Sequence, residues 1–217
     1  MRRELKQSIL AHRGRWVETN LPPNSFEALT DALSHGYGIE TDIRDVGSQI
    51  VIEHDAFQPG TTTLEQLFDF AATNGCKGVL GLNIKADGLV DAVVEMLERF
   101  GLDRHFFFDM SIPETLRYLR RTGERTFLRY SDCEIPDATL VTRAGGLWID
   151  CFEPGRDDVV ADGLAYAQER GLPFCLVSPE LHKREPEEYW TRFLPMVSDS
   201  KYICTDFPDR VWAALQD

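Results

Sequence analysis

The chain has 217 residues, of which 43% are hydrophobic and 27% are charged, the composition of an ordinary soluble globular protein. Its formal net charge of −13 disfavours binding to nucleic acid or to an anionic membrane surface, so we expect neither as a partner. The five cysteines are scattered without a CxxC pair, and no segment approaches the about 20 apolar residues of a membrane span. We therefore expect a reducing, cytoplasmic compartment.

Short apolar runs alternate with amphipathic helical patterns along the whole chain, beginning with "SILAH" and then "SFEALTDALSHG". A short extended segment, "QIVIEH", follows the second apolar run after a turn. The predicted barrel or sheet strands are 8–12, 38–43, 79–85, 105–110, 125–130, 146–152, 173–178 and 202–207. The predicted helices are 25–36, 62–75, 89–101, 112–123, 157–171, 185–194 and 208–216.

About eight strand–helix steps are the number found in a TIM (β/α)8 barrel, and we predict this α/β fold as one domain over residues 1–217. With 217 residues the chain is near the lower end of the length range of this fold, so the barrel is expected to be small. The stretch 131–145 has no good helical pattern, so one crossover is expected to be degenerate. An open, doubly wound sheet remains the alternative, because periodicity does not show whether a sheet closes.

Polar residues suited to catalysis or metal binding lie at the ends of the predicted strands, where a TIM barrel has its active site. The first strand ends in His12 and Arg13, and the third carries Lys85. Glu40 and Asp42 are two positions apart on the second strand, so both carboxylates project from one face. The remaining strand-end candidates are His54, Asn83, Asp87, Asp109, Asp150, Glu153 and Asp206.

Two carboxylates on one face repel each other unless a cation lies between them. A hard divalent ion with oxygen ligands, Mg²⁺ or Ca²⁺, fits Glu40 and Asp42. The alternative is a structural ion network in which one of these carboxylates pairs with Arg13 or Lys85. Histidine suits general acid–base work because its ordinary pKa lies near neutral pH.

Five segments, "AHRG", "PPNSFEAL", "GIETDI", "VIEHD" and "YICTDFPDR", resemble in this order the glycerophosphodiester phosphodiesterase family. The resemblance implies a TIM-barrel phosphodiesterase that requires a divalent cation. It also implies roles for the residues that match: His12 and His54 as the acid–base pair, Arg13 and Lys85 as phosphate contacts, and Glu40, Asp42 and Asn83 as metal ligands.

The chain departs from the family pattern at three places. Asn83 stands where the family usually has a third carboxylate, and an amide oxygen brings no formal charge, so a weaker metal site is expected. Asp87, Asp109 or Asp150 are candidates to compensate. Pro23 replaces a usual glutamate, and most of the usual insertion after the second strand is missing.

These features together predict a phosphoric diester hydrolase that converts a soluble glycerophosphodiester-like substrate to a phosphomonoester and an alcohol. Two alternatives remain open. One is a weak or inactive barrel that binds a phosphorylated ligand. The other is a lipid-directed phospholipase of the same superfamily, although the net charge and the lack of an exposed apolar loop are unfavourable for a membrane surface.

Overall fold

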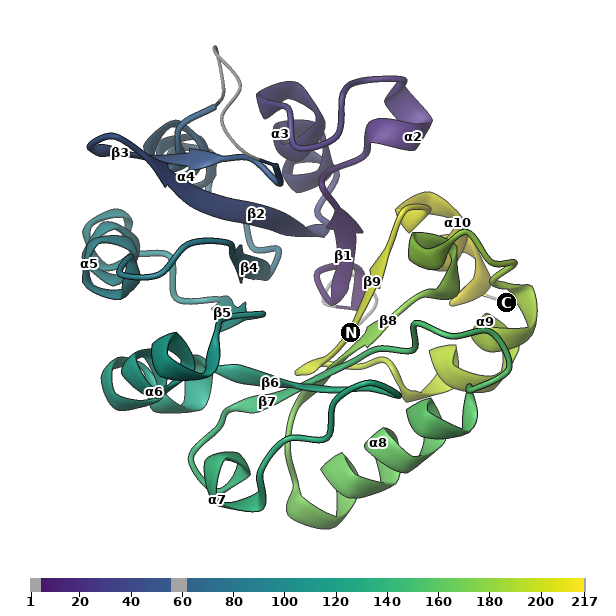
Figure 1. Ribbon diagram of the computed structural model, residues 1–217. Helices are drawn as coiled ribbons and strands as arrows, with labels where there is room; N and C mark the ends of the chain where they lie inside the picture. The colour runs from purple at the N-terminus through teal and green to yellow at the C-terminus, as the bar shows by residue number, and fades with distance from the viewer. Residues whose placement is uncertain (1–4, 56–61, 217) are drawn as a thin grey trace.

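A nine-stranded sheet forms the centre of the computed structural model, which describes residues 5–55 and 62–216. Eight strands pair in parallel in the order β5-β4-β2-β1-β9-β8-β7-β6, and β5 meets β6 through a bridge between Phe107 and Thr126. The sheet therefore curls into a nearly closed barrel (Figure 1). These strands are β1 (Ile9–His12), β2 (Gly38–Val46), β4 (Leu80–Ile84), β5 (His105–Phe108), β6 (Phe127–Tyr130), β7 (Gly146–Ile149), β8 (Phe174–Val177) and β9 (Lys201–Thr205).

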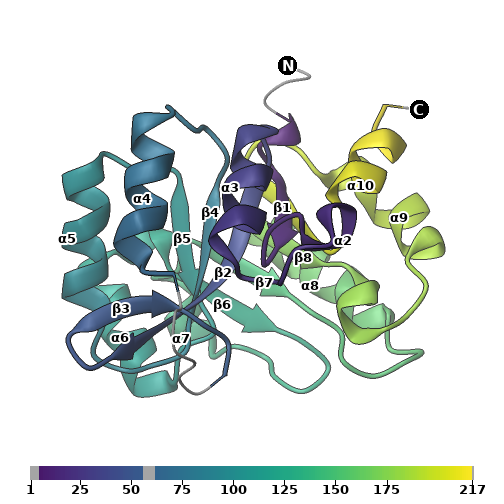
Figure 2. The ribbon, with the colours of Figure 1, turned by 90° about the horizontal axis from the view of Figure 1, so that it is seen from above.

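The helices surround the strands (Figures 1 and 2). They are α2 (Trp16–Thr19), α3 (Phe26–Ser34), α4 (Leu64–Thr73), α5 (Val90–Phe100), α6 (Ile112–Arg121), α7 (Ala138–Val141), α8 (Asp158–Arg170), α9 (Glu187–Phe193) and α10 (Pro208–Ala214). Short 3₁₀ turns occur at Gly123–Arg125 (η1), Pro179–His182 (η2) and Leu194–Met196 (η3). No helix in the described ranges is long and apolar enough to cross a membrane.

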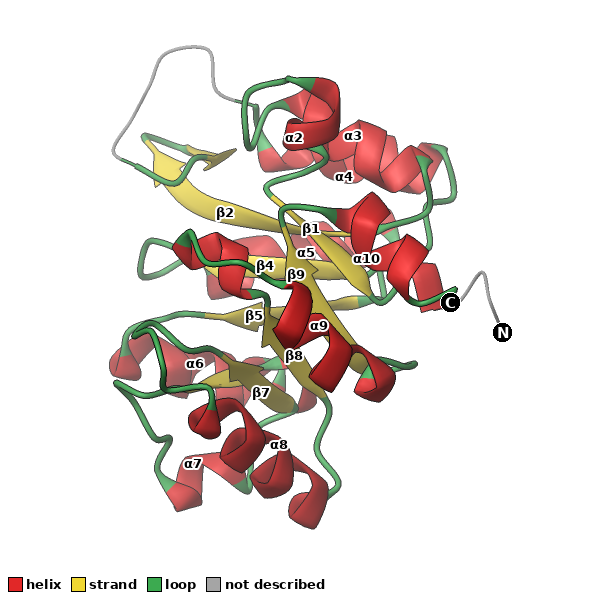
Figure 3. Cartoon of the chain, turned by 90° about the vertical axis from the view of Figure 1, so that its right-hand side faces the viewer, coloured by secondary structure: helices red, strands yellow, loops and turns green. Residues whose placement is uncertain are grey.

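The predicted TIM barrel is confirmed, and the open sheet is not observed. The crossover expected to be degenerate contains only the four-residue α7. β2 runs on beyond the barrel and pairs antiparallel with β3 (Gln49–Ile52), as Figure 3 shows. The shortened insertion was predicted in the connection from β3 to α4, of which residues 56–61 lie outside the described residues.

Local sequence explains why the helices begin and end where they do. Ser25 and Ser111 accept hydrogen bonds from the first turns of α3 and α6. Thr63 and Gln66 form a reciprocal capping box at the start of α4. Gly101 ends α5 in the left-handed conformation that glycine adopts without strain. Each cap lies at the boundary that the sequence pattern predicts, within two residues.

The inside of the barrel is filled by side chains. Phe108 stacks on Trp148 with ring centroids 3.8 Å apart, and Phe106 stacks on Phe127 at 4.2 Å. Gly81 makes room for this packing, because a Cβ there would lie 2.7 Å from a methyl group of Leu10. The barrel is thus a closed apolar core, and polar side chains find space only above it, at the carboxyl ends of the strands.

Candidate active site

The candidate residues share the inward-facing rows of the strands. His12 follows the buried interior residue Leu10 by two positions, and successive inward side chains on a strand are two residues apart. His12 is in register with Glu40 on the neighbouring strand, and Asp42 is in register with Asn83 on the next. The parallel strands therefore bring together three segments that are far apart in the chain.

Glu40, Asp42 and Asn83 form a buried oxygen-rich cluster, with exposed fractions of 2%, 1% and 8%. The Asn83 amide donates a hydrogen bond to Oε1 of Glu40 at 3.2 Å. The Asn24 amide donates a hydrogen bond to Oδ2 of Asp42 at 2.9 Å. The Thr41 hydroxyl donates a hydrogen bond to Oδ1 of Asn24, also at 2.9 Å. Asn24, in the segment matching "PPNSFEAL", thus orients Asp42.

Three oxygens of this cluster are suited to a cation. Oε2 of Glu40, Oδ1 of Asp42 and Oδ1 of Asn83 are buried and have no hydrogen-bond partner within the described residues. Burial and the neighbouring charge of Asp42 raise the pKa of Glu40 to about 7, although His12, Arg13 and the Asn83 hydrogen bond oppose the shift. A cation bound at this carboxylate would favour its ionised form. No group of three His, Cys, Asp or Glu side chains with metal-site geometry occurs within 5–55 and 62–216. In the cluster of Glu40, Asp42 and Asn83, one of the three oxygens belongs to an amide. The donor set fits a hard divalent ion with two charged ligands and one neutral ligand.

His12 is held in one orientation beside this cluster. Its Nδ1 lies 2.7 Å from Oδ1 of Asp206, and its Nε2 lies 3.9 Å from Oε2 of Glu40. Burial lowers the pKa of His12, but the hydrogen bond to Asp206 and the charges of Glu40 and Asp206 outweigh it, so the pKa is raised. His12 can therefore carry a proton on Nε2, at the side of the ring that faces the cluster.

A second layer of contacts fixes Asp206. Its backbone N–H donates to Oε1 of the buried Glu180 at 3.1 Å, and the Thr205 hydroxyl donates to the same oxygen. The Ser178 hydroxyl donates to the other oxygen of Glu180 and accepts a hydrogen bond from the Trp190 indole. Glu180 was not among the residues expected from the sequence, since it lies in a 3₁₀ turn with no periodic pattern.

The two expected phosphate contacts flank Asp42. Nε of Arg13 lies 3.3 Å from Oδ2 of Asp42, and Nζ of Lys85 lies 3.6 Å from Oδ1 of Asp42 and 2.9 Å from Oδ2 of Asp109. The structural ion network weighed from the sequence is thus present around Asp42. Arg13, Asn24 and Asp109 all have positive φ angles, of 58°, 60° and 70°. Strained backbone of this kind concentrates at functional sites.

His54 lies at the rim rather than in the cluster. The Glu53 N–H bonds to the Asp42 carbonyl at 3.1 Å and attaches this segment to the site. The His54 side chain is 42% exposed, and its Nδ1 lies 2.8 Å from Oδ1 of Asp55, which is 81% exposed. In the described ranges no hydrogen bond joins His54 to His12 or Glu40.

The structure gives the other strand-end carboxylates different partners. Asp87 accepts hydrogen bonds from the Ser111 hydroxyl, at the start of α6. Asp109 is bound by Lys85 and by Arg129, a residue of β6 that the sequence analysis did not single out. Asp150 is bound by His182, which was likewise missed.

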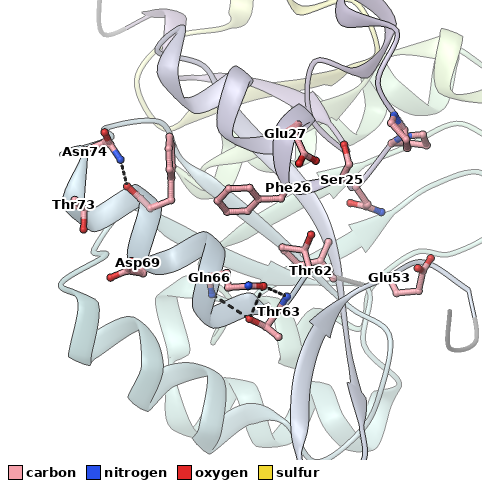
Figure 4. Close-up of a pocket in the computed structure, with 15 residues that line it drawn as sticks. Ser25, Phe26, Glu27, Glu53, Thr62, Thr63, Gln66, Asp69, Thr73 and Asn74 are labelled. Carbon is pink, nitrogen blue, oxygen red and sulfur yellow. Dashed lines mark hydrogen bonds between the residues drawn. The ribbon is translucent and has the colours of Figure 1, made fainter. Parts of the chain in front are cut away.

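An open groove of about 910 Å³ lies beside the cluster, between the start of α3 and α4 (Figure 4). Asn24, which orients Asp42, and Glu53, which precedes His54, both line it. Phe26 and Gln66 are among the side chains that face it in the close-up. The groove therefore adjoins the site through Asn24 and Glu53.

Comparison with solved structures identifies the fold family. No protein-family model and no curated protein sequence matches the chain. Solved structures match it over nearly its whole length. A glycerophosphodiester phosphodiesterase from Agrobacterium tumefaciens has a TM-score of 0.71 at 16% identity, covering 97% of this chain and 99% of that one.

Two further structures agree with this match. An Oleispira antarctica phosphodiesterase in complex with the product sn-glycerol-3-phosphate has a TM-score of 0.65 at 18% identity, covering 97% of both chains. A glycerophosphoryl diester phosphodiesterase from Parabacteroides distasonis has a TM-score of 0.66 at 17% identity, covering 99% of this chain and 90% of that one. The resemblance read from the sequence is therefore confirmed at the level of the fold: the chain has the TIM-barrel fold of the glycerophosphodiester phosphodiesterases.

Proposed function

We propose that the chain is a metal-dependent phosphodiesterase that hydrolyses a soluble glycerophosphodiester-like substrate to a phosphomonoester and an alcohol. The observation that carries this proposal is the buried group of three oxygens, from Glu40, Asp42 and Asn83, that have no hydrogen-bond partner among the described residues. His12 lies next to this group, and the cations of Arg13 and Lys85 lie beside Asp42. The shared fold supports it, as does the product-bound state of the Oleispira antarctica structure, which points to a small-molecule substrate.

Glu40, Asp42 and Asn83 are the residues that would hold the divalent ion, Mg²⁺ or Ca²⁺. Such an ion, when bound, stabilises negative charge on a phosphoryl oxygen and lowers the pKa of a hydroxyl group that it contacts. The three side chains are preorganised for this task. Asn24 fixes Asp42, and the Asn83 amide fixes Glu40.

His12 is the first proton-transfer group. Nδ1–H of His12 donates a hydrogen bond to Asp206, so Nε2 is the nitrogen that exchanges protons with the substrate. It can accept the proton of the attacking hydroxyl and later give it back to an oxygen of the substrate. His54, at the rim, is the second such group and serves the leaving alcohol. Attack by the hydroxyl next to the ester would release that alcohol and leave a cyclic phosphodiester, which water then opens to the phosphomonoester with the two histidines in exchanged roles.

Arg13 and Lys85 bind the phosphoryl oxygens through charge-assisted hydrogen bonds. Arg13 and Lys85 both contact Asp42, and Lys85 also contacts Asp109. Both cations are therefore already positioned at the site before a phosphate binds. Their charges lie on the side of the cluster where negative charge develops on the phosphate in the transition state.

Several further properties belong to the same proposal. The barrel strands run from Ile9 to Thr205, which supports one domain over 1–217. The net charge of −13 supports the absence of nucleic-acid partners and of stable membrane association. We also propose a cytoplasmic location, which the unpaired cysteines favour.

The test is a screen of soluble glycerophosphodiesters in which a coupled phosphomonoesterase releases phosphate, with Mg²⁺, Ca²⁺, Mn²⁺ or a chelator added. We expect metal-dependent phosphate release from at least one diester. Activity that survives exhaustive chelation would overturn the metal assignment. Ligand binding without turnover under every metal would favour a binding protein, and activity on vesicle lipids alone would favour a phospholipase.

A further inference from the structure

A further histidine–carboxylate pair lies at the barrel mouth, on the side opposite the oxygen cluster. Nε2 of His182 lies 2.7 Å from Oδ1 of Asp150. Asp150 directly follows β7, two residues after the interior residue Trp148, and we place it on the inward side of the ring. In the strand order, β7 is four strands from β2, which carries Glu40, so the two groups face each other across the ring.

The pair belongs to a wall formed by Arg129, Asp150, Phe152 and His182, which we call the far wall. The Phe152 ring contacts the edge of the His182 ring, with centroids 5.0 Å apart. The Arg129 guanidinium lies over the same Phe152 ring, 5.1 Å from its centroid. The four side chains therefore form one continuous surface.

The far wall is connected to the proposed phosphate site. Arg129 binds Asp109, and Asp109 binds Lys85 at 2.9 Å. A single series of contacts thus leads from Lys85, the proposed phosphate contact just after β4, to Arg129 on β6 and through Phe152 to His182. A diester whose phosphate lies at Lys85 and Arg13 would direct one of its two alcohols along this series, toward the far wall.

Hydrogen bonds within the protein hold the far wall in place. Asp132 accepts the backbone N–H groups of Phe152 and Glu153 at 2.9 Å each, which fixes the loop after β7. The Asp150 carboxylate accepts the Cys151 N–H at 2.8 Å, and Leu181, next to His182, packs on the interior cluster of the barrel. Preorganised polar groups of this kind are typical of a binding site.

The polar atoms of the far wall without a hydrogen-bond partner indicate which groups a ligand must offer. His182 uses Nε2 and Asp150 uses Oδ1, so Nδ1 of His182 and Oδ2 of Asp150 have no hydrogen-bond partner among the described residues. Oδ2 of Asp150 is an acceptor, and so is Nδ1 of a neutral His182 ring whose Nε2–H donates to Asp150. A pair of neighbouring hydroxyl groups satisfies both, and the Phe152 face suits the C–H groups of the same ligand.

We propose that the far wall binds the second alcohol of the diester, and that this alcohol is a polyol or sugar with neighbouring hydroxyl groups. This inference rests on the proposed phosphodiesterase function and names its substrate class. A simple alkyl alcohol would leave the free atoms of His182 and Asp150 unpaired, and so it would be a poorer substrate.

The experiment compares two glycerol phosphodiesters that differ only in the second alcohol, inositol or ethanol. For the wild type we expect kcat/KM to favour the inositol diester by about tenfold or more. In His182→Gln and in Asp150→Asn this preference should fall to about one, through a higher KM for the inositol diester. Glu153→Gln, on the same loop but exposed, is the matched control and should keep the preference.

Calorimetric titration with both diesters in the presence of Mg²⁺ separates this inference from the proposed function. Tighter binding of the inositol diester that is lost in His182→Gln supports the far wall, even where the wild type hydrolyses neither compound. Equal binding of both diesters by the wild type, or an unchanged preference in the two variants, overturns it. An equal loss on both diesters together with a lower Tm assigns the pair a structural role and also overturns it.

Discussion

His12 and Asp206 are 194 residues apart in the chain, yet Nδ1 of the histidine lies 2.7 Å from Oδ1 of the aspartate. The contact exists because β1 and β9 pair in parallel, with Ala11 in register with Thr205. His12 and Asp206 are the residues that follow this pair. The pairing of the first strand with the last therefore orients the proposed general base.

Asp206→Asn should lower kcat by about 10- to 100-fold while KM changes little, because the amide no longer fixes the tautomer of His12. The pKa of His12 should fall, since Asp206 contributes a hydrogen bond and a charge that raise it. Steady-state kinetics and an NMR titration of His12 measure both effects. Kinetics equal to wild type would show that His12 needs no orienting partner.

His12→Ala and His54→Ala should each lower kcat by about 10²–10⁴-fold with the fold intact, the scale of acid–base help. The two variants test different environments, because His12 is held by Asp206 whereas His54 is exposed at the rim. His35→Ala, an exposed histidine on the end of α3, is the control. A His54 variant with wild-type kcat would assign that residue to the surface and leave the second proton transfer to another group.

Much of this architecture follows from local sequence. The strand–helix alternation predicted the barrel, and caps such as Thr63 and stops such as Gly101 mark the ends of helices through contacts within a few residues. The cluster of Glu40 and Asn83 was also predictable, since parallel strands bring their carboxyl ends together. Their roles remain predictions.

The partners of the site residues were not predictable in the same way. Glu180 and His182 lie in a 3₁₀ turn that has no hydrophobic period, and their partners Thr205 and Asp150 are 25 and 32 residues away. Lys85 faces two carboxylates, Asp42 and Asp109, and only the three-dimensional arrangement decides how its charge is shared. Such choices depend on distances between strands that periodicity does not encode.

The pH dependence of stability has an identifiable contribution from His105, at the start of β5. Burial lowers the pKa of His105 to about 4, although its Nδ1 hydrogen bond to the Leu102 carbonyl opposes the shift. In the unfolded chain the pKa is about 6.5. Between pH 6.5 and 4 the unfolded state binds this proton and the folded state does not, so stability falls as the pH falls through that window.

His105→Gln should therefore reduce the acid slope of the unfolding free energy by up to about 1.4 kcal/mol per pH unit within that window. Chemical denaturation at intervals from pH 7 to 4.5 measures the slope. His35→Gln, which changes an exposed histidine, should leave most of it in place. A His105 variant that keeps the full wild-type slope would show that the neutral histidine is not a determinant of acid stability.

The last prediction concerns Asn83, whose amide donates to Oε1 of Glu40 at 3.2 Å and whose own oxygen is buried without a partner. Asn83→Asp adds a third carboxylate and removes the donor that now holds Glu40. Without a divalent ion the variant should lose on the order of 1–3 kcal/mol of stability, because a third carboxylate is buried beside Glu40 and Asp42 and the hydrogen bond to Glu40 is lost. With the ion, affinity should rise by about tenfold or more, since the charge on the ion is better neutralised.

Calorimetric Mg²⁺ titration and thermal unfolding with and without Mg²⁺ separate the two effects, and neither requires turnover. Asp87→Asn is the control for charge alone, because Asp87 lies on the connection after β4 and contacts Ser111 instead of the cluster. It should change neither the affinity nor the metal-dependent rise in Tm. If Asn83→Asp binds Mg²⁺ no more tightly than the wild type, the amide oxygen does not face the ion. In that case Glu40 and Asp42 would have to hold the ion without Asn83, and the weaker metal site expected from the sequence would have another cause.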